Sequence, residues 1–387
     1  MMRGSMVAKK LCSDVKLHHT ETFGAPLPFA WIGMRRPTLH FQLCSDVIYF
    51  LWYFYLHTVD KAVANILHVL KVWSSLFSKM IEDIVLSGSG PNGLIQLGVV
   101  QEYITQGYVD PTKLKKVYGC SAGAMIGALL ALQIPLDAVA EYMVKRPWNK
   151  FAKIDFLEMN ERGGLIECEK IRIMAEPLFL AYDIPLDITF LQAKEISNIE
   201  LHVFATDMQT FDSTDFNIHT FPNMPIVTAV MLSSALPPVF STGTYLGLSY
   251  FDGGFSDNFP LGACLNHASE PDPTKVLSVN LVGTQQPIHE NATLLEICMH
   301  IALQTANKIA KYHYNHDIGT KRCPHYIPVV AENIFSKGLW EKFLYSDVDR
   351  QALYERGKTL AQEHLEKWKI GQSPEEQRLA TEPVPEA

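Results

Sequence analysis

The sequence predicts an α/β domain in which a mainly parallel sheet lies between helices in three layers, followed by a helical C-terminal part. Short apolar segments alternate with helical segments from Met80 onward. Alternation of this kind is typical of a sheet that is covered on both faces. Of the 387 residues, 48% are hydrophobic and 19% are charged, which is enough apolar material for one large core.

The expected elements follow one another along a domain at 80–370. Buried strands are short apolar runs, whereas helices are longer and periodic. We expect strands at 84–86, 116–118, 199–206 and 276–282, and helices at 94–106, 122–133, 226–236, 292–312 and 340–369. The tail at 371–387 is rich in Pro, Glu and Gln, so we expect it to be disordered.

Residues 1–79 form a basic, aromatic-rich N-terminal extension. Residues 1–80 hold nine Lys and Arg against four Asp and Glu, although the whole chain has a net charge of −8. Apolar side chains recur at helical spacing from Val59 to Phe77, which predicts an amphipathic helix that packs on the domain or lies on a membrane surface. The apolar run at 47–56 is too short to span a bilayer unless a kinked helix continues it. Met80 is an alternative position for the first residue of the native protein.

The composition argues against several classes of protein. The net charge of −8 is unsuited to a nucleic-acid binder. Seven scattered cysteines indicate neither a disulfide framework nor a zinc ribbon. The first thirty residues carry no recognisable secretory signal, so we expect an intracellular protein, cytoplasmic or peripheral at a membrane surface. One group of potential ligands matches no zinc pattern, and we expect no metal site there: His313, His316, Asp317, Cys323 and His325.

A GxSxG motif stands between an expected strand and an expected helix. It consists of Gly119, Ser121 and Gly123. A sharp strand-to-helix turn exposes the serine hydroxyl as a nucleophile, and the two glycines give it room as the nucleophile elbow. The alternative without chemistry is a small-residue helix that packs closely on the sheet through Gly123, Gly127 and Ala131.

A glycine-rich GxGxxG segment stands between the first strand and its helix. Its residues are Gly88, Ser89, Gly90, Asn92 and Gly93. The same string binds dinucleotides in other folds, but no acidic residue closes a second strand about twenty residues later. Backbone N–H groups at a helix N-terminus can instead stabilise a developing oxyanion. We therefore expect these residues to form an oxyanion hole.

Asp252 is the candidate base that a serine nucleophile needs. It ends an aromatic strand and is followed by Gly253 and Gly254 in an Asp-Gly-Gly motif. An ordinary Asp-Gly turn between strands is the alternative. A carboxylate of ordinary pKa is a weak base, and we expect burial against neighbouring aromatic rings to raise its pKa. Three histidines are also present, none in a distinctive setting: His267, His289 and His300.

In this order and spacing the three motifs resemble the patatin-like phospholipases. Two further segments are similar to that family, 204–207 (FATD) and 233–240 (SSALPPVF), and the resemblance covers about residues 84–265. It implies a dyad of Ser121 and Asp252 that works through an acyl-serine without a catalytic histidine. It also implies a phospholipid or acylglycerol substrate and no metal or organic cofactor.

One position departs from the family pattern. Asn92 stands where the family usually has a basic residue, and Pro91 before it has no N–H. We expect a lipid acyl hydrolase of phospholipase A or esterase type that contacts membranes peripherally. A lipid transacylase and a catalytically weak lipid- or partner-binding protein are the alternatives, and Asp207 and Asp257 are reserve candidates for the base. The lipid headgroup, acyl position and protein partners stay open.

Overall fold

The computed structural model describes residues 80–150, 163–267, 272–283, 323–334 and 336–371, with single helical positions between 297 and 308. The expected amphipathic helix, the tail beyond residue 371 and most of the expected helix at 292–312 lie outside these residues. So do His289, His313, His316, Asp317 and the side chain of His267.

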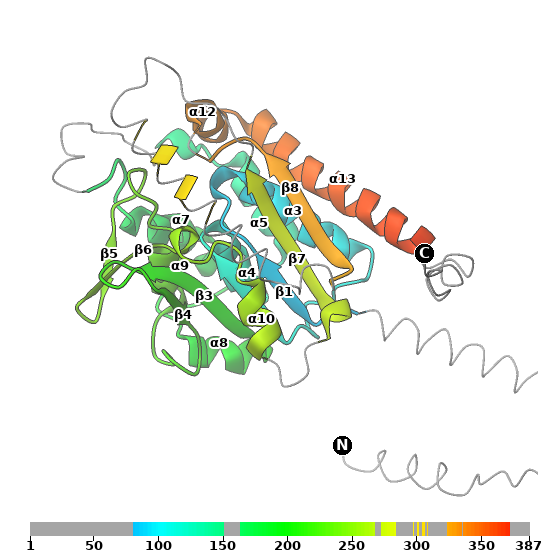
Figure 1. Ribbon diagram of the computed structural model, residues 1–387, viewed down its shortest axis with the longest axis horizontal. Helices are drawn as coiled ribbons and strands as arrows, with labels where there is room; N and C mark the ends of the chain where they lie inside the picture. Colours follow the sequence, from blue (N-terminus) through cyan, green and yellow to red (C-terminus); the bar gives the residue numbers. More distant parts are fainter. Residues whose placement is uncertain are drawn as a thin grey trace, which may run out of the picture. The chain divides into compact units, whose positions relative to one another are not determined.

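Within the described residues, eight strands form one mixed sheet (Figure 1). The order along its main path is β5-β6-β3-β2-β1-β7-β8, and β4 pairs with β3. The parallel strands are β1 (Asp83–Leu86), β2 (Lys116–Cys120), β3 (Glu200–Asp207), β7 (Val276–Gly283) and β8 (His325–Ala331). The antiparallel strands are β4 (Ser213–Phe216), β5 (Gly243–Tyr245) and β6 (Leu248–Asp252), next to β3 or each other.

Side chains of the central strands alternate between two apolar clusters. Ile84 and Leu86 of β1 join the larger cluster, whereas Val85 between them joins the smaller one together with Tyr118 of β2. Neighbouring side chains of a strand point to opposite faces, so both faces of the sheet are covered. Helix α10 (Leu261–His267) supplies Leu261 to the smaller cluster.

The other long helices contribute to the larger cluster. Their bounds are α3 (Gly93–Thr105), α4 (Ala122–Ala131), α5 (Leu136–Lys145), α7 (Glu169–Ala181), α8 (Phe190–Ser197), α9 (Ile226–Ser233), α12 (Lys337–Tyr345) and α13 (Asp347–Gly371). Helix α13 packs along α3 (Figure 1). The two backbones approach closely because Gly98 and Gly357 face each other's helix, where a Cβ would collide with a backbone carbonyl.

The predicted fold class is confirmed: a mostly parallel sheet lies among helices, and the C-terminal part is helical. The expected helix at 340–369 is two helices, because Ser346 is extended and its hydroxyl caps α13 by accepting from Asp349 N at 3.1 Å. The expected helix at 226–236 ends at Ser233, since Pro237 disfavours helical backbone just before it. No helix of the described residues is long and apolar enough to cross a membrane.

Candidate active site

Strand register brings the three motifs to one edge of the sheet. The glycine-rich loop follows β1 and Ser121 follows β2, and these strands are parallel neighbours. Open α/β sheets bind ligands at the carboxyl ends of such strands. In β3, Phe204 pairs with Cys120 and Ala205 pairs with Asp252. The aspartate that ends β6 therefore lies beside the end of β2, although Asp252 and Cys120 are 132 positions apart in the sequence.

Ser121 occupies a strained turn between β2 and α4. Its φ of 51° and ψ of −121° are unusual for a residue with a side chain. The surrounding backbone leaves no space for a Cβ at Gly119, which faces Ala124, or at Gly123, which faces the carbonyl of Leu86. The chain can therefore make this turn only with both glycines, as the motif predicted.

Ser233 fixes the backbone at this turn. Its hydroxyl accepts a hydrogen bond from Ser121 N at 2.8 Å and donates to the carbonyl of Phe204 at 2.5 Å. Ser233 is fully buried at the end of α9. It lies in the 233–240 segment, but this role was not visible in the sequence, because the bond depends on how α9 packs on the sheet.

Asp252 is buried, with 4% of its surface exposed. One carboxylate oxygen accepts a hydrogen bond from Gly254 N at 2.8 Å. Burial raises the pKa of Asp252 from 3.8 to about 6, and hydrogen bonds from the Ser121 side chain and the Gly254 amide oppose that rise. The direction agrees with the sequence-based expectation, and the raised pKa makes Asp252 a stronger proton acceptor than an exposed aspartate.

Asn258 holds the glycine-rich loop against the loop of Asp252. Its carbonyl accepts from Gly88 N at 3.0 Å, and its side-chain amide donates to Gly88 O at 3.1 Å. The peptide groups on both sides of Gly88 are thereby fixed, and a Cβ at Gly88 would collide with the Asn258 side chain. The sequence offered no signal for this residue, because the two partners are 170 positions apart.

The hydrogen bonds of this loop leave two of its amides available. Gly88 N donates to Asn258, Asn92 N donates to Ser89 O at 3.1 Å, and Gly93 N donates to carbonyls within the loop. Pro91 has no N–H. Within the described part of the chain, the amides of Ser89 and Gly90 donate to no other residue.

Asn92, at the position that departs from the family pattern, is fully buried. Its side-chain amide donates to the carbonyl of Glu332 at 2.9 Å, just beyond β8. Asn92 therefore connects the glycine-rich loop to the neighbouring strand end and brings no charge to the site.

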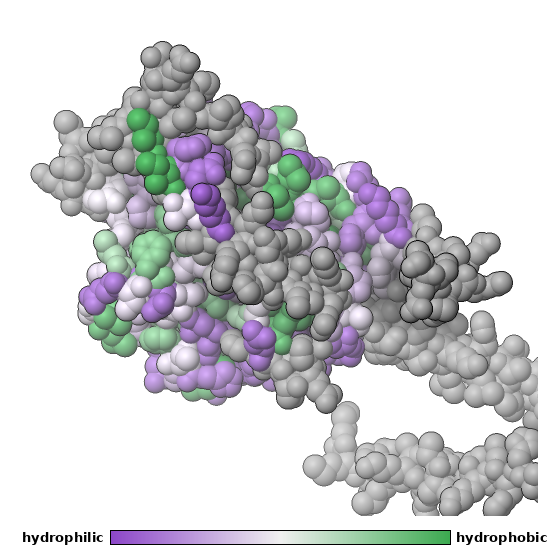
Figure 2. All heavy atoms as spheres, viewed as in Figure 1, coloured by the Kyte–Doolittle hydropathy of each residue, from purple (hydrophilic) through white to green (hydrophobic). Residues whose placement is uncertain are grey.

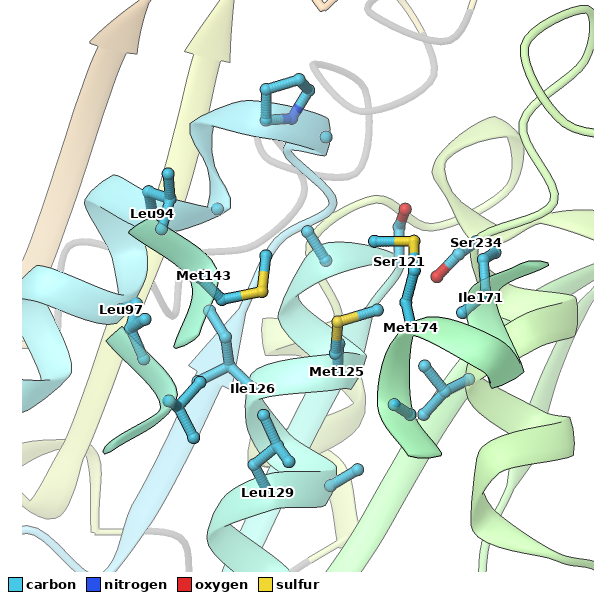
Figure 3. A pocket seen from close by; sticks show the side chains of 18 of the residues that line it. Leu94, Leu97, Ser121, Met125, Ile126, Leu129, Met143, Ile171, Met174 and Ser234 are labelled. Carbon is cyan, nitrogen blue, oxygen red and sulfur yellow. The ribbon is translucent and has the colours of Figure 1, made fainter. Parts of the chain in front are cut away.

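An apolar cavity begins at Ser121 and follows α4 (Figure 3). Ser121 just before this helix and Met125 and Leu129 on its successive turns line the cavity. Met174 of α7 faces them, and Ser234 lies beside Ser121. About 1240 Å³ of empty space lies between these helices, including the open mouth. None of its lining residues carries a charge.

Of the two reserve candidates for the base, Asp207 has other surroundings. Asp207 accepts hydrogen bonds from the amides of Gln209 and Thr210 in the turn after β3. Asp257 N donates to Gly253 O in the Asp252 loop. Of the cluster considered for metal binding, His325 lies in the core, with its Nδ1 3.2 Å from the hydroxyl of Tyr103.

Comparisons with known proteins agree with the motifs. Residues 84–265 match the family model of the patatin-like phospholipases. The chain is 26% identical over 186 residues to the uncharacterized protein R571 of Acanthamoeba polyphaga mimivirus, covering 47% of this chain and 60% of that protein. It is also 26% identical over 204 residues to the probable lipid hydrolase 463L of Invertebrate iridescent virus 6, covering 52% of this chain and 69% of that protein. The matches therefore span only part of each relative.

Two solved structures are more distantly similar. VipD from Legionella pneumophila gives a TM-score of 0.45 at 16% identity, with 74% of this chain and 67% of that chain covered. ExoU from Pseudomonas aeruginosa, solved in complex with SpcU, gives a TM-score of 0.40 at 14% identity, with 74% of this chain and 52% of that chain covered.

Proposed function

We propose, from the premise that residues 84–265 form a patatin-like phospholipase domain, that the chain hydrolyses acyl esters of lipids. Ser121 is the nucleophile and Asp252 its base. The observation that carries the proposal is one arrangement: a serine on a strained turn lines an apolar cavity, and a buried carboxylate lies beside the end of the strand that precedes this serine.

The acylation step follows from these positions. Asp252 accepts the hydroxyl proton of Ser121 while Oγ attacks the ester carbonyl carbon. The amides of Ser89 and Gly90 donate to the oxyanion in this proposal, because they have no other acceptor within the described residues. The tetrahedral intermediate then collapses, and Asp252 returns the proton to the leaving alkoxide. An alcohol departs, and the acyl group stays on Ser121.

Deacylation repeats the same proton transfers with water. A water molecule attacks the acyl-serine carbonyl and gives its proton to Asp252, and collapse of the second intermediate returns this proton to Ser121 Oγ. The products are a fatty acid and the free enzyme. A base with a pKa of about 6 suits both steps, because it is ionised at neutral pH and still binds a proton more strongly than an ordinary aspartate.

We expect the activity to fall at acid pH as Asp252 becomes protonated. The ionised carboxylate is the active form, so kcat/KM should be constant above pH 7 and fall about ten-fold per pH unit well below an apparent pKa of about 6. Release of fatty acid from phospholipid and acylglycerol vesicles, and turnover of a soluble ester, measure this profile.

Circular dichroism at each pH separates loss of activity from unfolding. An activity that stays constant down to the ordinary aspartate range would contradict a buried carboxylate base. Absence of fatty acid release from every lipid at neutral pH would contradict the proposed function itself.

The cavity predicts a preference for long acyl chains that one substitution should remove. Ala128 lines the cavity seven residues after Ser121, about 10 Å along α4. In Ala128→Leu, the added side chain fills the space that a long chain would occupy. We expect kcat/KM for a palmitoyl ester to fall about ten-fold or more, while kcat/KM for a butyryl ester changes little. The short ester is the internal control, and equal losses on both esters would contradict the assignment of the cavity to the acyl chain.

A further inference from the structure

Two neighbouring turns at the carboxyl end of β3 expose large apolar side chains. One turn joins β3 to β4 and carries Met208 and Phe211, and the other joins β5 to β6 and carries Leu246, which is followed closely by Leu248 at the start of β6. Leu246 is 79% exposed and Phe211 is 52% exposed. Single exposed apolar residues are common on protein surfaces, but four on two adjacent turns are a feature that needs an explanation. These four residues are called the apolar turn pair below.

The apolar turn pair is continuous with the candidate active site. Met208 N donates to Ser249 O at 2.9 Å, which ties the first turn to β6. The ring of Phe211 lies 5.3 Å from the ring of Phe251, which precedes Asp252. At the β5 and β6 end of the fold (Figure 1), the surface in Figure 2 shows hydrophobic side chains interspersed with hydrophilic ones. A lipid aggregate that touched these turns would therefore lie beside the catalytic edge of the sheet.

The backbone at both turns favours residues other than the ones present. Phe211 has a φ of 66° and Leu246 has a φ of 50°, both in the left-handed region. Asparagine and glycine adopt this conformation most readily, and Asn-Gly is the usual pair in a two-residue hairpin turn such as Leu246-Gly247. Exposed apolar side chains at these two positions therefore oppose both the solvent and the backbone, and strain of this kind often marks functional surfaces.

The charges of the two turns indicate the kind of surface that they fit. The segments 207–212 and 244–249 contain Asp207 and Asp212 and no Lys or Arg. A surface with only negative charges is repelled by anionic lipid headgroups, whereas apolar side chains enter an uncharged interface readily. We propose that the apolar turn pair docks the protein on neutral or zwitterionic lipid aggregates and so presents the cavity mouth to its substrate. This inference rests on the proposed lipid hydrolysis.

Asparagine substitutions test the docking without disturbing the turns. In the double variant Phe211→Asn with Leu246→Asn, both new residues suit the left-handed backbone, so the fold should be retained. The two single variants, the double variant and the wild-type surface are each prepared as full chains that also carry Ser121→Ala, which prevents turnover. These proteins are sedimented with phosphatidylcholine vesicles at high salt. We expect binding to weaken about ten-fold for each substitution, because each removes a side chain that enters the lipid.

A matched substitution on another surface provides the control. Ile196 is 55% exposed in α8, next to the start of β3 and therefore at the opposite edge of the sheet. We expect Ile196→Gln to bind vesicles as wild type does. With Ser121 intact, the double variant should also hydrolyse a soluble butyryl ester at the wild-type rate, which shows that the site is preserved.

Several outcomes would overturn the docking proposal. Equal vesicle binding by the double variant and wild type would do so directly. A changed oligomeric state in light scattering with unchanged vesicle binding would show that the apolar turn pair contacts protein instead of lipid. If the wild-type protein did not hydrolyse the soluble ester, the proposed function would be refuted. The docking proposal would still be tested, because vesicle binding is measured on the inactive Ser121→Ala protein.

Discussion

Replacing Ser121 with alanine should reduce the turnover of a soluble nitrophenyl ester by about four orders of magnitude or more. The substitution removes the proposed nucleophile, so the proposed acyl-serine could not form. The strained turn should survive, because it depends on Gly119, Gly123 and the hydrogen bond from Ser121 N to Ser233. Initial rates measure the loss, and circular dichroism confirms the fold.

Ser234→Ala is the matched control for this result. Ser234 is buried beside Ser121 in the same cavity, and its hydroxyl has no hydrogen-bond partner within the described residues. It is thus a serine of similar surroundings without the strained turn. We expect the Ser234→Ala protein to retain most of its activity. If the two variants lost activity in the reverse order, Ser234 and not Ser121 would be the nucleophile.

Replacing Asp252 with asparagine should abolish turnover and at the same time stabilise the fold. An asparagine cannot accept the proton of Ser121, so the rate should fall about as far as in Ser121→Ala. Its side-chain oxygen can still accept the hydrogen bond from Gly254 N. The opposite signs of the two effects distinguish a buried catalytic base from a structural aspartate, whose loss would destabilise the protein.

The stabilisation has a defined dependence on pH. The pKa of Asp252 is about 6 in the folded protein and 3.8 in a free chain, so the folded state binds more protons between these values. Wild-type stability therefore falls as the pH rises through this window. At pH 8 the raised pKa of Asp252 lowers the free energy of unfolding of wild type by about 3 kcal/mol, and below pH 4 this effect vanishes.

Urea unfolding of wild type and Asp252→Asn at pH 8 and pH 4 measures this difference. A variant less stable than wild type at pH 8 would contradict the account of Asp252. The histidines are the kinetic control: single replacements of His267, His289 and His300 should leave most of the turnover. A histidine as essential as Ser121 would indicate a triad in place of the dyad.

The sequence was informative where function depends on local geometry. A serine turn between a strand and a helix requires glycines at fixed positions, and this requirement is visible in the residues around Ser121. The parallel strands β1, β2, β3 and β7 were also predicted as short apolar runs, whereas β8 at His325–Ala331 was not. The family resemblance over residues 84–265 is confirmed by the family model.

What the sequence could not reveal depends on distant partners. The bond from Ser121 N to Ser233 joins residues 112 positions apart, and the bonds between Gly88 and Asn258 join residues 170 positions apart. For the same reason the sequence could not show which amides of the glycine-rich loop are already occupied. The predicted oxyanion donors included Gly88, whose amide donates to Asn258.

The central claim is that Ser121 attacks the acyl substrate, and covalent labelling tests it most directly. A long-chain alkyl fluorophosphonate is incubated with the full chain, and the labelled peptide is identified by mass spectrometry. The account predicts one adduct, on Ser121, that excess long-chain ester suppresses and that Asp252→Asn forms far more slowly. An adduct on Ser89 or Ser234, or no adduct on Ser121 while the enzyme is turning over lipid, would contradict it.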